Sequence, residues 1–357
     1  MRDAGAAAAG TTAADPLEET DADAEADFRG AITGKNVTAA YHREYERAAP
    51  ELLRARPKVL LTKYRIILVP GFLTRLYMQL NEVAKGTLQQ DGFLDYLSAQ
   101  QEALKELGFT DPQELLDKTQ FDTIASVAVN GERIASALTA ARSAGKKVIL
   151  ISHSKGGNDT LAALLLLQKR RALGGVAGWI SLQSGFYGSP VADEAMKRPA
   201  LQKVSQVLLE EAGGGSMDAL RDSTSAACRR FMATHDKDIR QLVRTVPILS
   251  FLSWKPKPRD AQLLHPDTIL FTTRDLMEAQ GLKNDGLIPR KNALLPGTEY
   301  VALVHIDHAE TAMNEPAPIT PSKLDRKRLT WALLAMLFER LEHPAAAAKT
   351  LPARAAR

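Results

Sequence analysis

One serine occupies a position that favours nucleophilic chemistry. The segment 152–157 reads Ser-His-Ser-Lys-Gly-Gly, and it joins an apolar run at 147–151 to a leucine-rich run beginning near residue 160. It differs from Gly-x-Ser-x-Gly, the pattern of a serine held on a sharp strand-to-helix turn, only at Ser152. Such a turn crowds the residues two before and two after the serine, so both must be small, as Ser152 and Gly156 are. The sequence therefore predicts Ser154 as a nucleophile, against the alternative of an ordinary turn that contains a serine by chance.

A serine nucleophile needs a base that takes its proton, and histidine is the usual one. Two histidines, His305 and His308, follow the apolar run 300–304. We predict that His308 is the base, because it stands farther from the end of the strand. His305 is the alternative, with a packing role as the simpler explanation. The His-x-x-His spacing also fits a metal pair, but the neighbouring acid and the serine motif argue against it, and no metal is predicted.

The base in turn needs a carboxylate that fixes its tautomer. Asp285 lies in Asn-Asp-Gly at 284–286, and a carboxylate on such a turn after a late strand could reach the histidine. The same tripeptide is also a turn sequence in its own right, because Asn and Asp bond their own backbone and Gly accepts positive φ. Asp285 is the predicted acid, and Asp307 is the weaker alternative.

Acyl transfer also requires two backbone N–H groups aimed at the developing oxyanion. The residue after the nucleophile, Lys155, supplies one of them at a helix N-terminus, where N–H groups lack helical partners. The other is expected in the loop after the apolar run 65–69, where Pro-Gly-Phe follows at 70–72. We predict the Phe72 N–H as this donor. The alternative is a plain β-turn at Pro-Gly.

Strand-like and helix-like segments alternate along the chain, as the positioning of these residues would require. Apolar runs predict strands at 65–69, 147–151, 176–182, 246–252 and 300–304. Helical spacing of apolar residues predicts helices at 92–107, 132–143, 160–169 and 322–342. This alternation predicts an α/β fold with a mostly parallel central sheet and helices on both faces.

Composition shifts divide the chain into three parts. Residues 1–35 are alanine-rich and acidic without apolar periodicity, and residues 344–357 are also alanine-rich; both predict disordered tails. Residues 36–343 are predicted to form one domain, with a helical cap inserted at about 191–245. An amphipathic stretch near 201–208 followed by Gly-Gly-Gly at 213–215 marks this insertion.

Composition also narrows the function classes. The chain has 357 residues, 45% hydrophobic and 25% charged, with a formal net charge of +4. Basic residues are scattered among acids without an aromatic stripe, so nucleic-acid binding is not expected. No run reaches the ~18 apolar residues of a membrane span and no leucine-rich secretion signal opens the chain, so a cytoplasmic protein is predicted. Transient contact with a membrane or lipid surface stays open, as does the oligomeric state.

Several segments together resemble the lipase and esterase branch of the α/β-hydrolase superfamily. They are VPGF (69–72), SHSKGG (152–157), YGSPVAD (187–193), NDGLIP (284–289) and DHAE (307–310). The resemblance covers about residues 60–342 and implies Ser154 as nucleophile, Asp285 as acid, His308 as base, and oxyanion donors at Phe72 and Lys155. It implies no organic cofactor. The chain order Ser, Asp, His is the order of that fold.

These observations predict a serine hydrolase that cleaves carboxylic esters, lipid-like or other acyl esters, through an acyl-enzyme. A phospholipase, a polyester depolymerase, an amidase or an acyltransferase would use the same three residues. A different class of protein, a non-catalytic binding protein on a hydrolase fold, is the remaining alternative. It is disfavoured because the serine, the acid and the histidine are all present.

Overall fold

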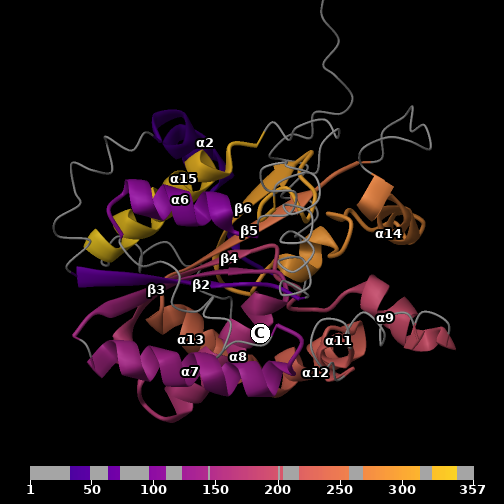
Figure 1. Cartoon of the computed structure of the whole chain (residues 1–357), viewed down its shortest axis with the longest axis horizontal. Coiled ribbons are helices and arrows are strands. Elements are labelled where there is room, and N and C mark those ends of the chain that lie inside the picture. Colours follow the sequence, from indigo (N-terminus) through magenta and orange to yellow (C-terminus); the bar gives the residue numbers. More distant parts are fainter. Residues whose placement is uncertain are drawn as a thin grey trace, which may run out of the picture.

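The computed structural model describes residues 33–48, 63–72, 96–109, 123–143, 145–199, 202–203, 217–256, 268–313 and 324–343. Within these ranges one parallel sheet contains strands β1 (Lys35–Asn36), β2 (Tyr64–Val69), β3 (Lys147–His153), β4 (Val176–Leu182), β5 (Ile248–Trp254) and β6 (Glu299–Val304). The strand order is β1-β6-β5-β4-β3-β2 (Figure 1).

Helices join the strands and cover both faces of the sheet. Those before β4 are α2 (Thr38–Arg47), α6 (Ser98–Glu106), α7 (Val127–Ser143) and α8 (Lys155–Lys169), followed by the short 3₁₀ helix η1 (Leu173–Gly175). Those after β4 are α9 (Pro190–Lys197), α11 (Asp218–Asp222), α12 (Ser225–Thr234), α13 (Asp236–Thr245), α14 (Thr268–Glu278), η2 (Arg290–Ala293) and α15 (Arg326–Glu342).

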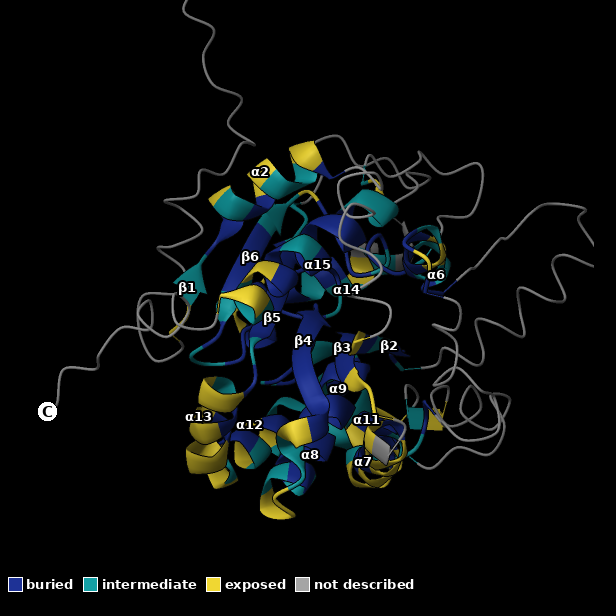
Figure 2. Cartoon of the chain, turned by 90° about the vertical axis from the view of Figure 1, so that its left-hand side faces the viewer, coloured by how far each residue is buried: buried dark blue, intermediate teal, exposed yellow. Residues whose placement is uncertain are grey.

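The central strands are apolar on both faces because both faces are covered. In β3, Ile149 and Ile151 pack with α2, α6 and α15, whereas Val148 and Leu150 pack with α7, α8 and α13. Figure 1 shows these two helical layers above and below the sheet, and Figure 2 shows the central strands buried between them. The predicted class, an α/β fold with a mostly parallel sheet between helices, is confirmed.

The observed elements differ from the predicted ones mainly at their ends. Helix α8 begins at Lys155 rather than near 160, directly after the Ser154 turn. Strand β1 was not predicted, because a two-residue strand leaves no periodicity in the sequence. Residue 96, which the spacing over 92–107 placed in a helix, precedes α6 and forms an isolated bridge with Met313.

The predicted cap at 191–245 contains α9, α11, α12 and α13 in its described part. Helix α13 contributes Ile239 and Leu242 to the same core as α8, so this part of the segment covers the sheet. The cap as a substrate cover stays a prediction, and most of the amphipathic stretch at 201–208 lies outside the described residues. The predicted tails lie outside them too, apart from residues 33–35, where β1 begins. Of the helices in the described ranges, none is both long and apolar enough to cross a membrane.

Candidate active site

The turn between β3 and α8 holds Ser154 in an unusual backbone conformation. Its φ is 56° and its ψ is −131°, a combination that residues with a side chain rarely adopt. The turn is tight enough that a Cβ on Gly156 would lie 2.4 Å from the Pro70 carbonyl oxygen. On Gly157 it would lie 1.8 Å from the Ser184 Oγ. The two glycines therefore let α8 start against β2 and β4, and Ser154 lies at the apex, partly accessible to solvent.

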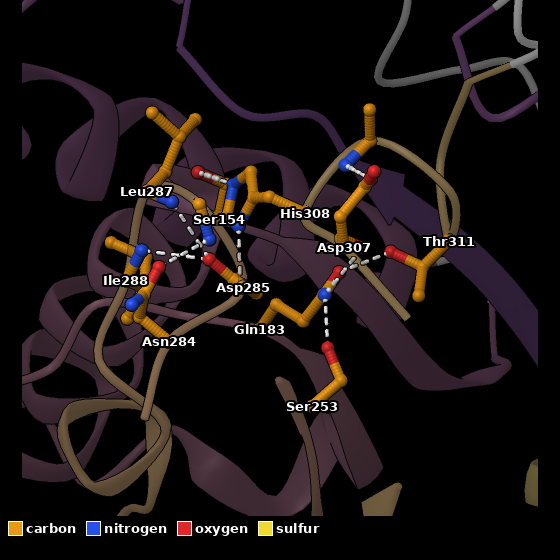
Figure 3. Close-up of polar contacts among 12 residues, drawn as sticks. Ser154, Gln183, Ser253, Asn284, Asp285, Leu287, Ile288, Asp307, His308 and Thr311 are labelled. Carbon is orange, nitrogen blue, oxygen red and sulfur yellow. Dashed lines mark hydrogen bonds and ion pairs between the residues drawn. The ribbon is translucent and has the colours of Figure 1, made fainter. Parts of the chain in front are cut away.

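His308 connects the serine to an acid. Its Nε2 lies 2.8 Å from the Ser154 Oγ, and its Nδ1 lies 2.8 Å from the Asp285 Oδ2 (Figure 3). The imidazole is buried, 4% exposed, and Asp285 is 1% exposed. The structure thus brings together three side chains from loops after three different strands. A neutral imidazole that donates from Nδ1 to the carboxylate presents a lone pair at Nε2 to the serine hydroxyl.

The turn at 284–286 fits both interpretations of its sequence: it bonds its own backbone, and it carries a carboxylate that reaches the histidine. The Asn284 Oδ1 accepts the Gly286 N–H at 2.9 Å, and Gly286 has a φ of 100°, as in an Asx turn. The Asp285 Oδ1 accepts the N–H groups of Leu287 and Ile288 at 3.0 and 2.7 Å, which leaves Oδ2 for His308. The backbone of the turn therefore orients the carboxylate toward the imidazole.

The alternative residues lie elsewhere. The Asp307 Oδ1 accepts the N–H groups of Ala309 and Glu310, and its Oδ2 lies 3.4 Å from the Lys255 Nζ. Glu310 in turn accepts the Asp307 N–H at 2.6 Å. This reciprocal pairing shapes the loop that carries His308. His305 is exposed, with a φ of 65°. Among the residues that the structure describes, no three His, Cys, Asp or Glu side chains lie close enough together to hold a metal ion.

The predicted oxyanion donors flank the serine. Lys155 is the first residue of α8, a position at which the N–H has no helical acceptor. On the other side, a Cβ on Gly71 would lie only 2.9 Å from the Ser154 Cβ. The end of β2 therefore lies against Ser154, and Phe72 follows directly. Both predicted donors belong to segments next to Ser154.

The Lys155 side chain turns away into the core and forms an ion pair. Its Nζ lies 2.8 Å from the Asp159 Oδ1 and 2.9 Å from the Asp159 Oδ2, and both side chains are nearly inaccessible. The Asn130 Nδ2 donates to the Asp159 Oδ2 at 3.0 Å. Burial raises the pKa of the Asp159 carboxyl to about 6, against the lowering effect of Lys155.

Two further residues at the site had no role in the sequence prediction. Gln183 follows β4 with a φ of 46°, is fully buried, and donates to the Ser253 Oγ and to the Asp307 carbonyl oxygen (Figure 3). A polar residue directly after a buried strand was the available signal. Tyr96, whose hydroxyl contacts Gly71 and His153, gave no such signal, because it fits an apolar helical spacing.

Ser152, the departure from the usual glycine, also has a partner. Its Oγ accepts the indole N–H of Trp179 at 2.8 Å, and both side chains are fully buried. The hydroxyl is small enough for the crowded turn and satisfies a donor that burial would otherwise leave unpaired.

Comparison with solved structures places this architecture among known folds. The metagenomic carboxyl esterase MGS0156 superposes with a TM-score of 0.57 at 20% identity, over 78% of this chain and 76% of that one. The lipase of Staphylococcus hyicus superposes with a TM-score of 0.52 at 13% identity, over 80% of this chain and 97% of that one. No protein-family profile and no curated protein sequence matches the chain. With its parallel sheet, the sharp turn at Ser154 and these structural neighbours, the chain has the α/β-hydrolase fold.

Proposed function

We propose that the chain is a serine hydrolase that cleaves carboxylic esters through a covalent acyl-enzyme. The main support is the position of the His308 imidazole, whose two nitrogens each lie 2.8 Å from an oxygen, one of Ser154 and one of Asp285. This arrangement is the one that activates a serine hydroxyl. The fold shared with a carboxyl esterase and a lipase is consistent with the proposal.

In the first half-reaction the His308 Nε2 takes the Ser154 proton while Oγ forms a bond to the ester carbonyl carbon. The carbonyl oxygen becomes an oxyanion and accepts the backbone N–H groups of Lys155 and Phe72. Asp285 stabilises the imidazolium at Nδ1. When the tetrahedral intermediate collapses, the bond to the leaving oxygen breaks, and His308 protonates the departing alcohol.

In the second half-reaction a water molecule attacks the acyl-enzyme. His308 accepts a proton from the water, the same N–H groups hold the second oxyanion, and the proton then returns to the Ser154 Oγ as the acid is released. The substrate class that we propose is a lipid-like or other acyl ester, supported by the resemblance of segments 69–72, 152–157 and 187–193 to lipases and esterases.

The test is turnover of a series of p-nitrophenyl esters with acyl chains of increasing length, together with labelling by a fluorophosphonate probe. Ser154→Ala should lower kcat by at least about 10⁴-fold and abolish labelling, because the acyl-accepting oxygen is gone. Equal turnover in Ser154→Ala would refute the proposal. A wild-type chain that neither turns over esters nor labels would favour a non-catalytic binding protein.

A matched pair of histidine variants isolates the base. His308→Asn should lower kcat by about 10³-fold or more, because no group then takes the serine proton. His305→Asn should leave kcat within about twofold, because His305 is exposed and asparagine tolerates its positive φ. If the two variants lost activity equally, His308 would not be the base.

A further inference from the structure

A chain of hydrogen bonds runs behind the serine from the end of β2 to the loop that carries His308. The Gly71 N–H donates to the Tyr96 hydroxyl at 2.8 Å. The same hydroxyl lies 2.5 Å from the His153 Nδ1, and the His153 Nε2 lies 3.1 Å from the His308 carbonyl oxygen. Tyr96 and His153 are 8% and 2% exposed. We call this chain of contacts the Tyr96–His153 link.

The surrounding groups determine where the protons of the link lie. The Gln183 Nε2 donates to the Asp307 carbonyl oxygen, so the Gln183 Oε1 is the side that faces the His153 Nε2 at 3.3 Å. The His153 Nε2 thus faces two acceptors, the Gln183 amide oxygen and the His308 carbonyl oxygen, and must carry the hydrogen.

The other nitrogen of His153 is consequently an acceptor. Burial and the neighbouring His308 hold the pKa of His153 well below its usual 6.5, so its imidazole is neutral and Nδ1 has a lone pair. The Tyr96 O–H donates to Nδ1 and accepts the Gly71 N–H with its own lone pair. Every contact of the link then has one donor and one acceptor.

The link is also tightly packed against the nucleophile. A Cβ on Gly71 would lie 2.5 Å from the Tyr96 hydroxyl and 2.9 Å from the Ser154 Cβ. The rings of His153 and His308 have centroids 4.7 Å apart. One buried link therefore touches three parts of the site: the strand end that precedes the predicted oxyanion donor Phe72, the Ser154 turn, and the backbone of His308.

We propose that Tyr96 and His153 are positioning residues that fix the end of β2 relative to the His308 loop, so that the oxyanion donor and the base keep their places around Ser154. This role rests on the proposed esterase function. The physical reason is that acyl transfer depends steeply on the placement of donors and base, and displacements of about 1 Å cost about 100-fold in rate. Neither residue transfers a proton to the substrate.

Three variants break different contacts of the link. Tyr96→Phe removes the hydroxyl and with it both bonds, to Gly71 and to His153. His153→Gln places an amide N–H where Nε2 stands and keeps the bond to His308, but it has no acceptor at the Nδ1 position. His153→Asn keeps the bond to Tyr96, because its amide oxygen replaces Nδ1, and it loses the bond to the His308 carbonyl oxygen. Kinetics on one p-nitrophenyl ester and the second-order rate of fluorophosphonate labelling are measured for each variant.

We expect Tyr96→Phe to lower kcat and the labelling rate by about 10- to 100-fold, with KM changed less than about twofold, because positioning acts on the transition state. His153→Gln should show a loss in the same direction. The double variant Tyr96→Phe/His153→Gln should be no slower than Tyr96→Phe, because both changes break the same Tyr96–His153 link. His153→Asn should also lose activity, because it breaks the bond to the His308 carbonyl oxygen.

Tyr64→Phe is the matched control, a buried tyrosine at the opposite end of β2. It should retain kcat and the labelling rate. Thermal unfolding of Tyr96→Phe, compared with wild type, should show whether that variant is folded. A Tyr96→Phe chain within twofold of wild type in both rates overturns the positioning role. So do losses that multiply in the double variant, since independent contributions would then act.

The two proposals fail in different ways. If the wild-type chain shows no Ser154-dependent labelling, the esterase function fails, and the positioning role fails with it. If the wild-type chain labels at Ser154 but Tyr96→Phe labels equally fast, the positioning role alone is wrong.

Discussion

At the scale of single residues, the Asp285 carboxylate combines two tasks that the sequence presented as alternatives. One oxygen accepts two backbone N–H groups of its own turn, and the other faces His308. The turn therefore orients the acid. A carboxylate held in this way can accept from the imidazole without losing its own local hydrogen bonds.

Asp285→Asn should retain the turn and lose turnover. Its amide oxygen can still accept the N–H groups of Leu287 and Ile288, so the amide nitrogen would face the His308 Nδ1. Two donors cannot face each other, so the imidazole would carry its hydrogen at Nε2 and could not take the serine proton. We expect kcat to fall by about 10⁴-fold, because the imidazole is held in the wrong tautomer. Ester kinetics measure it.

Asp307→Asn is the control for that variant, because Asp307 was the alternative acid and its carboxylate bonds its own loop and Lys255. We expect a loss of less than about tenfold, since only the positioning of the loop is affected. A larger loss in Asp307→Asn than in Asp285→Asn would reverse the assignment of the acid.

Ser152 offers a second prediction at the residue scale. Ser152→Gly restores the glycine of the common motif but leaves the buried indole N–H of Trp179 without this acceptor. We expect a loss of about 1–3 kcal/mol in the free energy of unfolding for the unpaired donor, with the labelling rate of Ser154 unchanged. Urea denaturation followed by tryptophan fluorescence measures it. A variant as stable as wild type would show that the bond contributes nothing.

At the scale of elements, the first residue of α8 combines a proposed functional task with a structural one. Its N–H is the predicted oxyanion donor, while the Lys155 side chain pairs with Asp159 inside the protein. Removing one partner of a buried pair is far more costly than replacing both, because a lone buried charge remains.

Lys155→Met should therefore lower the free energy of unfolding by about 3 kcal/mol at pH 8, because the buried Asp159 carboxylate loses its counter-charge. The double variant Lys155→Met/Asp159→Asn should recover most of that loss, since its asparagine oxygen can still accept from Asn130. Chemical denaturation of the two variants and wild type is the measurement. A double variant less stable than the single one would contradict the argument.

The same pair predicts a pH dependence of stability. The Asp159 pKa is about 6 in the folded chain against its usual 3.8. Between these two values the carboxyl is protonated in the folded state and ionised in the unfolded state. Its contribution to stability is fully present below about pH 4 and is lost as pH rises through 6. Relative to Lys155→Met/Asp159→Asn, wild type should lose about 2–3 kcal/mol between pH 4 and 6.5. A pH-independent difference would be the contrary result.

At the scale of the whole molecule, the candidate site is assembled at the carboxyl ends of the strands from loops far apart in sequence. Ser154 follows β3, Asp285 lies between β5 and β6, and His308 follows β6. The edge strand β1 lies next to β6 at the other side of the sheet from β2. Strand β1 carries none of these three residues, so stability contributed at β1 should be separable from activity.

Thr38 tests this separation. Its buried Oγ1 accepts the Ala302 N–H of β6 at 2.9 Å and donates to the Asn36 Oδ1 at 2.6 Å. Thr38→Val keeps the shape but leaves the Ala302 N–H without this acceptor, so we expect a loss of about 1–3 kcal/mol in the free energy of unfolding and unchanged kcat. Thr38→Ser, which keeps the hydroxyl, should lose less. A kcat that fell in parallel with stability would refute the separation.

The sequence by itself determined the features that depend on neighbouring residues. The apolar runs located five of the strands, since burial on both faces requires continuous hydrophobic sequence. The small residues around Ser154 located the sharp turn, and Asn-Asp-Gly located the turn at Asp285. These signals are local, because strand periodicity and turn chemistry are set within a few residues.

Only the tertiary structure decided which side chains face each other. Ser154 and His308 are 154 positions apart, and their contact depends on the packing of the whole sheet. His308 pairs with Asp285 rather than Asp307, and Tyr96 meets Gly71 and His153. Both outcomes follow from how separate loops pack at the carboxyl ends of the strands. No short-range pattern encodes such contacts, because their geometry is fixed by strand order and helix packing rather than by spacing along the chain.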